Sequence, residues 1–100
     1  MGNGKEQMQV EFHNRANAVF FSIHRAFEQS VSSVSRRNEE YKFQQLKKQH
    51  AEAMERELQK IAKEILAKFK NEKQLDEMEQ IFSRFIKDYL HRFVQKVNDL

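Results

Sequence analysis

The side chains of this chain that could do chemistry are its four histidines and the carboxylates near them. His24 and Glu28 are four residues apart, a spacing that places both side chains on one face of a helix. Asp88 and His91 are three residues apart and share a helix face in the same way. Helical di-iron proteins need a Glu-x-x-His motif on each of two helices and a further Glu on each of two others. Only one Asp-x-x-His pair is present, away from the main apolar line, so we expect no metal site and no cofactor.

Two of the histidines have other possible roles. A phosphorylatable histidine at position 24 would need exposure and a cation placed to receive the phosphate. Arg25 is adjacent in sequence but points about 100° away around a helix, which argues against this role. His50 lies between Leu46 and Met54 on an apolar stripe, so we expect it to be half-buried in a helix seam. If that seam were shared with a second copy, protonation near pH ~6 would weaken assembly.

Catalytic motifs are missing from the sequence. There is no cysteine, and both glycines lie within the first four residues, which removes phosphate-cradling and dinucleotide-binding loops. The serines cluster without the glycine-rich elbow that exposes a nucleophilic serine. We therefore expect a protein that is not an enzyme and has no catalytic residues.

The composition favours helices throughout one domain. Of the 100 residues 33% are charged, none is proline, and the net charge is +3. The cations and acids alternate along the chain, as on a solvated helical surface. No apolar run approaches the roughly 18 to 20 residues that span a bilayer, and the first residues lack the layout of a signal peptide. We expect no membrane partner and a cytoplasmic or nuclear location.

Hydrophobic periodicity predicts the elements that position these side chains. Apolar residues recur three or four positions apart in three segments, which predicts three amphipathic helices. The predicted helices cover about residues 5–35, 39–70 and 72–98, behind a flexible leader of residues 1–4, and residues 5–100 form a single helical domain. In the first helix, the neighbours Phe20 and Phe21 widen the apolar face, so we expect one ring in the core and the other at a flank or an intermolecular contact.

The breaks between helices carry weaker signals. Serines in residues 30–38 compete for backbone hydrogen bonds, and Asn38 is a plausible N-cap, which places a turn at about residues 35–38. Because the segment holds neither proline nor glycine, an unbroken helix is the alternative. A second break is expected at residues 70–73, where Asn71 and Gln74 form a weak capping pattern.

Helix length and the width of the apolar faces predict the architecture. A helix of thirty residues is about 45 Å long, which is long for a compact chain of this size. We therefore expect an all-α fold, either an elongated three-helix bundle or a helical hairpin with coiled-coil character, completed by dimerisation. The third helix has the broadest apolar face and is expected to lie between two neighbours.

These features predict a protein that binds other proteins. We expect a module for protein–protein interaction and oligomerisation that binds itself and another protein, as an adaptor does, through an apolar helix groove. The residues predicted to form its core or interface are Phe20, Phe27, Leu58, Ile61, Ile65, Phe82, Phe85 and Phe93. The alternative is an accessory nucleic-acid-binding protein with a basic patch near the first turn. Its predicted contacts are Arg36, Arg37, Lys42, Lys47 and Lys48.

Overall fold

The computed structural model describes residues 4–34, 37–68 and 72–99 of the chain. Three helices account for nearly all of these residues, and no strand occurs among them. The helices are α1 (Gly4–Val31), α2 (Glu40–Ala67) and α3 (Glu72–Asn98). The prediction of an all-α fold is therefore confirmed.

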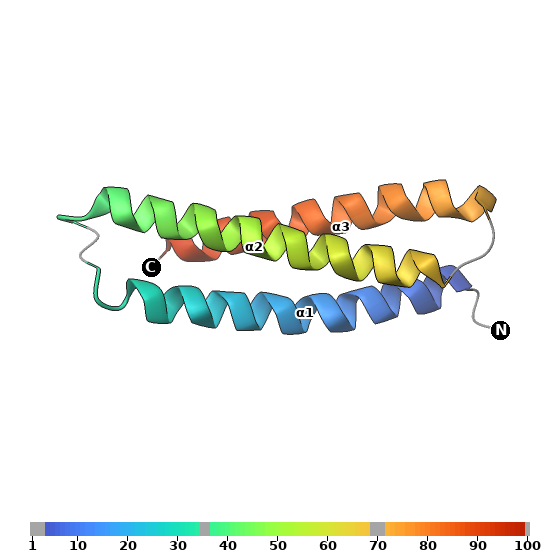
Figure 1. Ribbon diagram of the computed structural model, residues 1–100, viewed down its shortest axis with the longest axis horizontal. Helices are drawn as coiled ribbons and strands as arrows, with labels where there is room; N and C mark the ends of the chain where they lie inside the picture. Colours follow the sequence, from blue (N-terminus) through green and yellow to red (C-terminus); the bar gives the residue numbers. More distant parts are fainter. Residues whose placement is uncertain (1–3, 35–36, 69–71, 100) are drawn as a thin grey trace.

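The three helices pack side by side as an elongated bundle (Figure 1). α1 and α3 run in the same direction and α2 runs antiparallel to both, so the two termini lie near opposite ends of the molecule. The bundle measures 54 × 20 × 18 Å. α3 contacts both other helices, as its broad apolar face predicted. Of the two predicted architectures, the structure has the three-helix bundle.

The first break begins earlier than predicted. α1 ends at Val31 and not near residue 35, and the alternative of an unbroken helix is wrong because residues 32–34 and 37–39 are not helical. The hydroxyl of Ser32 donates a hydrogen bond of 2.8 Å to the Gln29 carbonyl. The Val34 N–H donates a bond of 3.0 Å to the Val31 carbonyl and closes a turn. Side-chain and turn hydrogen bonds thus replace the next helical turn, as serine-rich segments favour.

The start and end of α2 also differ from the prediction. The N-cap residue is Glu39 and not Asn38, and its side chain makes no capping hydrogen bond. The Glu39 carboxylate instead forms an ion pair of 2.8 Å with Lys42 in the first turn. α2 ends at Ala67, three residues before the predicted end, and the Lys68 N–H caps it by donating to the Ile65 carbonyl at 3.1 Å. The predicted cap Asn71 lies outside the described residues.

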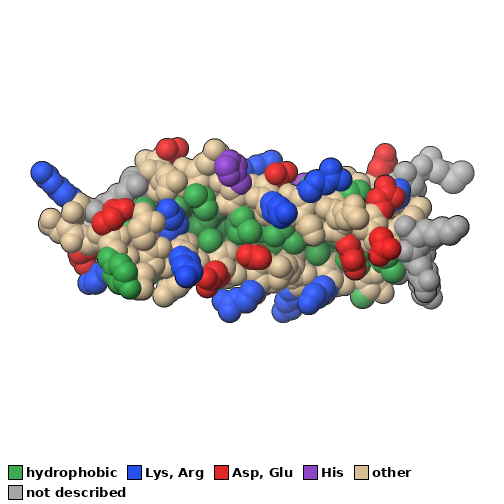
Figure 2. Space-filling view, turned by 90° about the horizontal axis from the view of Figure 1, so that it is seen from above, with side chains coloured by type: hydrophobic (Ala, Val, Ile, Leu, Met, Phe, Trp, Pro, Cys, Tyr) green, Lys and Arg blue, Asp and Glu red, His purple; other side chains and the backbone are tan. Residues whose placement is uncertain are grey.

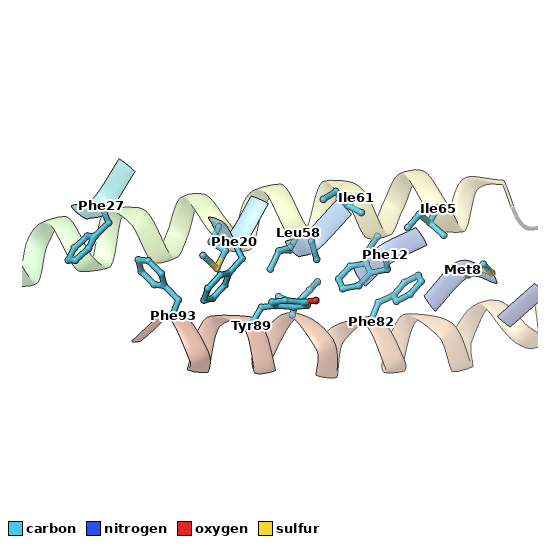
Figure 3. Close-up of a cluster of buried hydrophobic side chains, with 14 of the residues drawn as sticks. Met8, Phe12, Phe20, Phe27, Leu58, Ile61, Ile65, Phe82, Tyr89 and Phe93 are labelled. Atoms are coloured by element: carbon cyan, nitrogen blue, oxygen red, sulfur yellow. The ribbon is translucent and has the colours of Figure 1, made fainter. Parts of the chain in front are cut away.

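Every buried residue in the described part of the chain is hydrophobic. Seven of the eight predicted core or interface residues are buried, and Phe85 is half-buried. Figure 3 shows rings from α1 and α3 meeting aliphatic side chains of α2, among them Leu58, Ile61 and Ile65. The predicted residues therefore form the internal core of one chain.

The seam between α1 and α3 is built from aromatic rings. Phe12 stacks on Phe82 with ring centroids 4.8 Å apart, and Phe27 and Phe93 meet edge to face with centroids 5.7 Å apart. The α1 and α3 backbones come close at fewer positions than those of α1 and α2. A groove lies on the outside of the bundle along this seam.

Ion pairs between helices lie along the rim of the bundle. Lys5 of α1 pairs with Glu77 of α3 at 2.6 Å. Arg15 of α1 pairs with Glu64 of α2, and this hydrogen bond from Arg15 lowers the pKa of the Glu64 carboxyl. Exposed pairs of this kind contribute little stability, so the register of the helices depends mainly on the core.

Candidate interaction surface

Three large hydrophobic side chains are exposed in the described part of the chain, and two of them belong to α1. Val10 is 58% exposed and Phe21 is 67% exposed. Their separation of eleven residues is close to three helical turns, so both lie on the same side of α1. We call the exposed stripe that contains them, about 100° wide around the helix, the α1 ridge. It consists of Glu6, Val10, Asn14, Asn17, Phe21 and Arg25, all of them exposed.

The neighbours Phe20 and Phe21 have opposite environments. Phe20 is 7% exposed and lies in the core, whereas Phe21 is 67% exposed. Their ring centroids are 6.2 Å apart and the rings are perpendicular. The prediction that one ring enters the core and the other stays outside it is confirmed.

A groove of about 430 Å³ lies beside the ridge, between α1 and α3. We call it the α1–α3 groove. It is lined by Asn17, Phe20, Phe21, Tyr89, Arg92, Gln95, Lys96 and Asp99. Its apolar surface comes from the three aromatic rings, and its polar groups come mainly from α3.

Two cations of the groove rest on its aromatic rings. The Arg92 guanidinium lies 5.4 Å from the centroid of the Tyr89 ring, and the Lys96 ammonium lies 5.5 Å from that of Phe20. Cations over ring faces are attracted by the ring quadrupole. Neither cation has a carboxylate partner among the described residues, and the same holds for Arg25 at the end of the ridge. The groove can therefore receive an anionic group.

A short chain of hydrogen bonds crosses from α1 to α3 at the groove. The Tyr89 hydroxyl donates to Asn17 Oδ1 at 3.2 Å and lies 2.9 Å from His13 Nδ1. Burial raises the pKa of the Tyr89 phenol, and the positive charge of Arg92 partly offsets this shift. The sequence reasoning missed this cluster. The spacing of four residues between His13 and Asn17 was the available signal, because it places both side chains on one face of α1. It does not indicate that Tyr89 of α3 joins them.

His24 has an incomplete set of hydrogen bonds. Its Nδ1 lies 2.7 Å from the Glu28 carboxylate, and its ring lies parallel to Phe20 at 6.1 Å. Its Nε2 is buried and has no hydrogen-bond partner in the part of the chain that the structure describes. Asp88 and His91 are both exposed, and no cluster of three or more potential metal ligands occurs among the described residues.

His50 is half-buried, as predicted. Its Nδ1 lies 2.7 Å from the Leu46 carbonyl oxygen, so the Nδ1–H tautomer would donate this bond. Its ring meets the ring of Phe27 edge to face at 5.4 Å. The seam that His50 occupies therefore lies between α1 and α2 of the same chain.

The cations predicted to contact nucleic acid lie in different surroundings. They are Arg36, Arg37, Lys42, Lys47 and Lys48. Arg36 lies outside the described residues. The hydrogen bond and the negative charge of Glu39 raise the pKa of Lys42. Lys47 is half-buried and donates to Asn98 Oδ1 at 3.2 Å. Two of the four described cations, Lys42 and Lys47, therefore already have partners within the chain.

A second groove, of about 350 Å³, lies between α2 and α3. Its apolar lining includes Ala62, Leu66 and Ile86, and its rim carries Lys63 and Glu79. In the view from above, hydrophobic side chains form a strip along the middle of the molecule, flanked by charges of both signs (Figure 2). The nearby charges do not favour one class of ligand at this groove.

Comparison of the chain with protein-family models, with curated proteins and with solved structures finds no match. Among the described residues, no helix has the length and apolar character needed to cross a bilayer.

Proposed function

We propose that this protein is a non-enzymatic module for protein–protein interaction and oligomerisation whose contact surface is the α1 ridge together with the α1–α3 groove. One observation carries the proposal. Val10 and Phe21 are exposed on one ridge, while the phenylalanines of the core are already packed within the chain. Exposed apolar side chains that share a face next to a groove are typical of binding surfaces.

The surface suits an amphipathic helix. A partner helix laid along α1 would cover Val10 and Phe21 with its own apolar stripe, with side chains interlocking as in a coiled coil. Carboxylates on the flank of that helix would meet Arg92 and Lys96. Charge pairs at the rim of an interface mainly set orientation and the association rate, whereas burial of the apolar residues supplies affinity. We place this adaptor-like activity in the cytoplasm or the nucleus.

Site-specific photo-crosslinking tests the proposal in cells. A benzophenone amino acid at position 21 keeps an aromatic ring on the ridge. The matched control carries the same group at Glu52, which is exposed on α2. We expect covalent adducts from position 21 that the control does not form, with the captured chain identified by mass spectrometry. The absence of adducts from position 21, or the same adducts from both positions, would refute the proposed surface.

A further inference from the structure

We infer that the helix covering the α1 ridge is α1 of a second copy of this chain, antiparallel to the first about a twofold axis. This inference rests on the proposed function, because it names the partner of the same ridge. The evidence is the symmetry of the ridge itself, in apolar residues, in amides and in charge.

The ridge is symmetric about a point between Arg15 and Ala16. Val10 lies as far before this midpoint as Phe21 lies after it. Glu6 and Arg25 are likewise equally distant from the midpoint, as are Asn14 and Asn17. When two such helices cross antiparallel at the midpoint, each residue of these pairs faces its counterpart on the other copy.

The facing residues are chemically complementary. Val10 of each copy meets Phe21 of the other, so the four exposed apolar side chains of the two ridges are covered. Glu6 of each copy meets Arg25 of the other, so the dimer has two ion pairs between the copies. A parallel arrangement would instead place Arg25 against Arg25 and Glu6 against Glu6, and like charges face each other at a cost.

The amides at the centre fit the same arrangement. Asn17 already accepts a hydrogen bond from Tyr89 through Oδ1, which leaves its NH₂ group to donate outward. Asn14 is exposed, and its side chain has no hydrogen bond among the described residues. The two asparagines of each copy can therefore bond across the twofold axis and define the register.

The surface of α1 also has the required shape. A hollow on the ridge is lined by Gln7, Val10, Glu11 and Asn14, together with Glu6 and Arg15 at its edges. The first four residues have the spacing of a hole that receives one side chain of a packed antiparallel helix. In the antiparallel register this hollow receives Phe21 of the second copy.

The groove adds to the charge complementarity. Near Phe21, the ridge and the adjoining groove carry three cations, Arg25, Arg92 and Lys96, which have no carboxylate partner among the described residues. Asp99 also lines the groove. The opposite end of the ridge carries Glu6. A twofold axis brings each positive end beside a negative end. Because the contact is isologous, it closes at two copies and leaves no open edge.

The dimer should be weak and salt-sensitive. Each copy contributes two apolar anchors, which is less than a standard interface of about 800 Å² per partner contains. We therefore expect dissociation in the micromolar to submillimolar range, measured by sedimentation equilibrium of the full chain between about 10 µM and 1 mM. Raising the salt should weaken the dimer, since the ion pairs are exposed.

Charge reversal gives a specific test. Glu6→Arg alone, or Arg25→Glu alone, should weaken the dimer by about tenfold or more, because two pairs per dimer change from attraction to repulsion. A mixture of the two single variants should dimerise again, because every facing pair in the mixed dimer is opposite in charge. The matched controls are Lys48→Glu and Glu52→Arg, which reverse exposed charges on α2 and should leave the dimer unchanged.

The outcomes separate this inference from the proposed function. A wild-type chain that stays monomeric up to about 1 mM, or a mixture no stronger than the single variants, overturns the antiparallel pairing. Crosslinks from position 21 to a different protein, with a monomeric chain, would overturn the self-pairing and leave standing the proposal that the α1 ridge binds another protein. Circular dichroism of each variant verifies that the helices are intact.

Discussion

Replacing each of the neighbours Phe20 and Phe21 with alanine tests where the core of this bundle ends. The two side chains are chemically identical and adjacent, and they differ in environment. Phe20 is 7% exposed and Phe21 is 67% exposed. The structure therefore predicts a large loss of stability for Phe20→Ala and almost none for Phe21→Ala.

The expected magnitudes follow from burial. Truncating a buried phenylalanine to alanine costs about 3–5 kcal/mol, and Phe20 also loses ring contacts with Tyr89 and Lys96, so we expect ~4 kcal/mol. About a third of Phe21 is covered, which corresponds to ~1 kcal/mol of lost burial. The higher helix propensity of alanine returns about 0.5 kcal/mol, so the net change should stay within about 0.5 kcal/mol.

Urea unfolding followed by circular dichroism measures both effects. With an unfolding slope of about 1–2 kcal/mol/M, Phe20→Ala should lower the midpoint by about 2–4 M and Phe21→Ala by less than about 0.5 M. The protein concentration is kept near 2 µM, and the measurement is repeated tenfold higher, so that self-association does not contribute to the midpoint. Equal shifts, or a larger shift for Phe21→Ala, would mean that α1 is rotated by about one residue and that the core assigned to it is wrong.

Three further results are expected. Leu58→Asp places an unpaired carboxylate at a site with 0% exposure, so the helical circular dichroism should be lost at neutral pH, and a folded variant would contradict the core assignment. Because burial raises the pKa of Tyr89, its contribution to stability is present below pH ~10 and is lost as the pH rises through the folded pKa. Phenolate absorbance in a Tyr41→Phe background measures this titration, and equal folded and urea-unfolded titrations would be inconsistent with a buried hydroxyl. The hydrogen bond from Arg15 lowers the pKa of Glu64, so its contribution to stability is present above the unfolded pKa and is lost as the pH falls through the folded pKa. Glu64→Gln should therefore reduce the difference between the urea midpoints measured at pH ~7 and ~3, and an unchanged difference would count against this pair.

Much of the fold was predictable because helical burial repeats every 3.6 residues. The stripes that contain Phe12, Leu58 and Phe93 were visible as spacing alone, and all three residues are fully buried. The helix ends were less predictable. The end of α1 depends on local hydrogen bonds such as that from Ser32 to Gln29, and serine occurs both inside helices and at their ends.

The candidate surface was only partly predictable from the sequence. Spacing placed Phe20 among the predicted core or interface residues and left Phe21 out, and Phe20 is indeed the buried ring of the two. It did not indicate that Phe21 lies beside a groove between α1 and α3. The bond between Tyr89 and Asn17 joins residues 72 positions apart, and no local pattern indicates such a pair. The residues predicted to form the core or an interface were the most apolar positions of the helices. Such positions are the ones that the core of a single chain buries.

The position of the exposed ridge follows from the geometry of a three-helix bundle. Each helix has two neighbours within the chain and can bury only the arc of its surface that faces them. The apolar face of α3 is broad, but it fits between α1 and α2. The apolar residues of α1 extend farther around the helix, so Val10 and Phe21 fall outside the arc that its neighbours cover.

No rotation of α1 would bury these two residues without exposing Phe12 and Phe27, which are 0% exposed in the core. We therefore propose that a third neighbour for α1 comes from another chain, and the matched positions of Glu6 and Arg25 favour a second copy of the same helix.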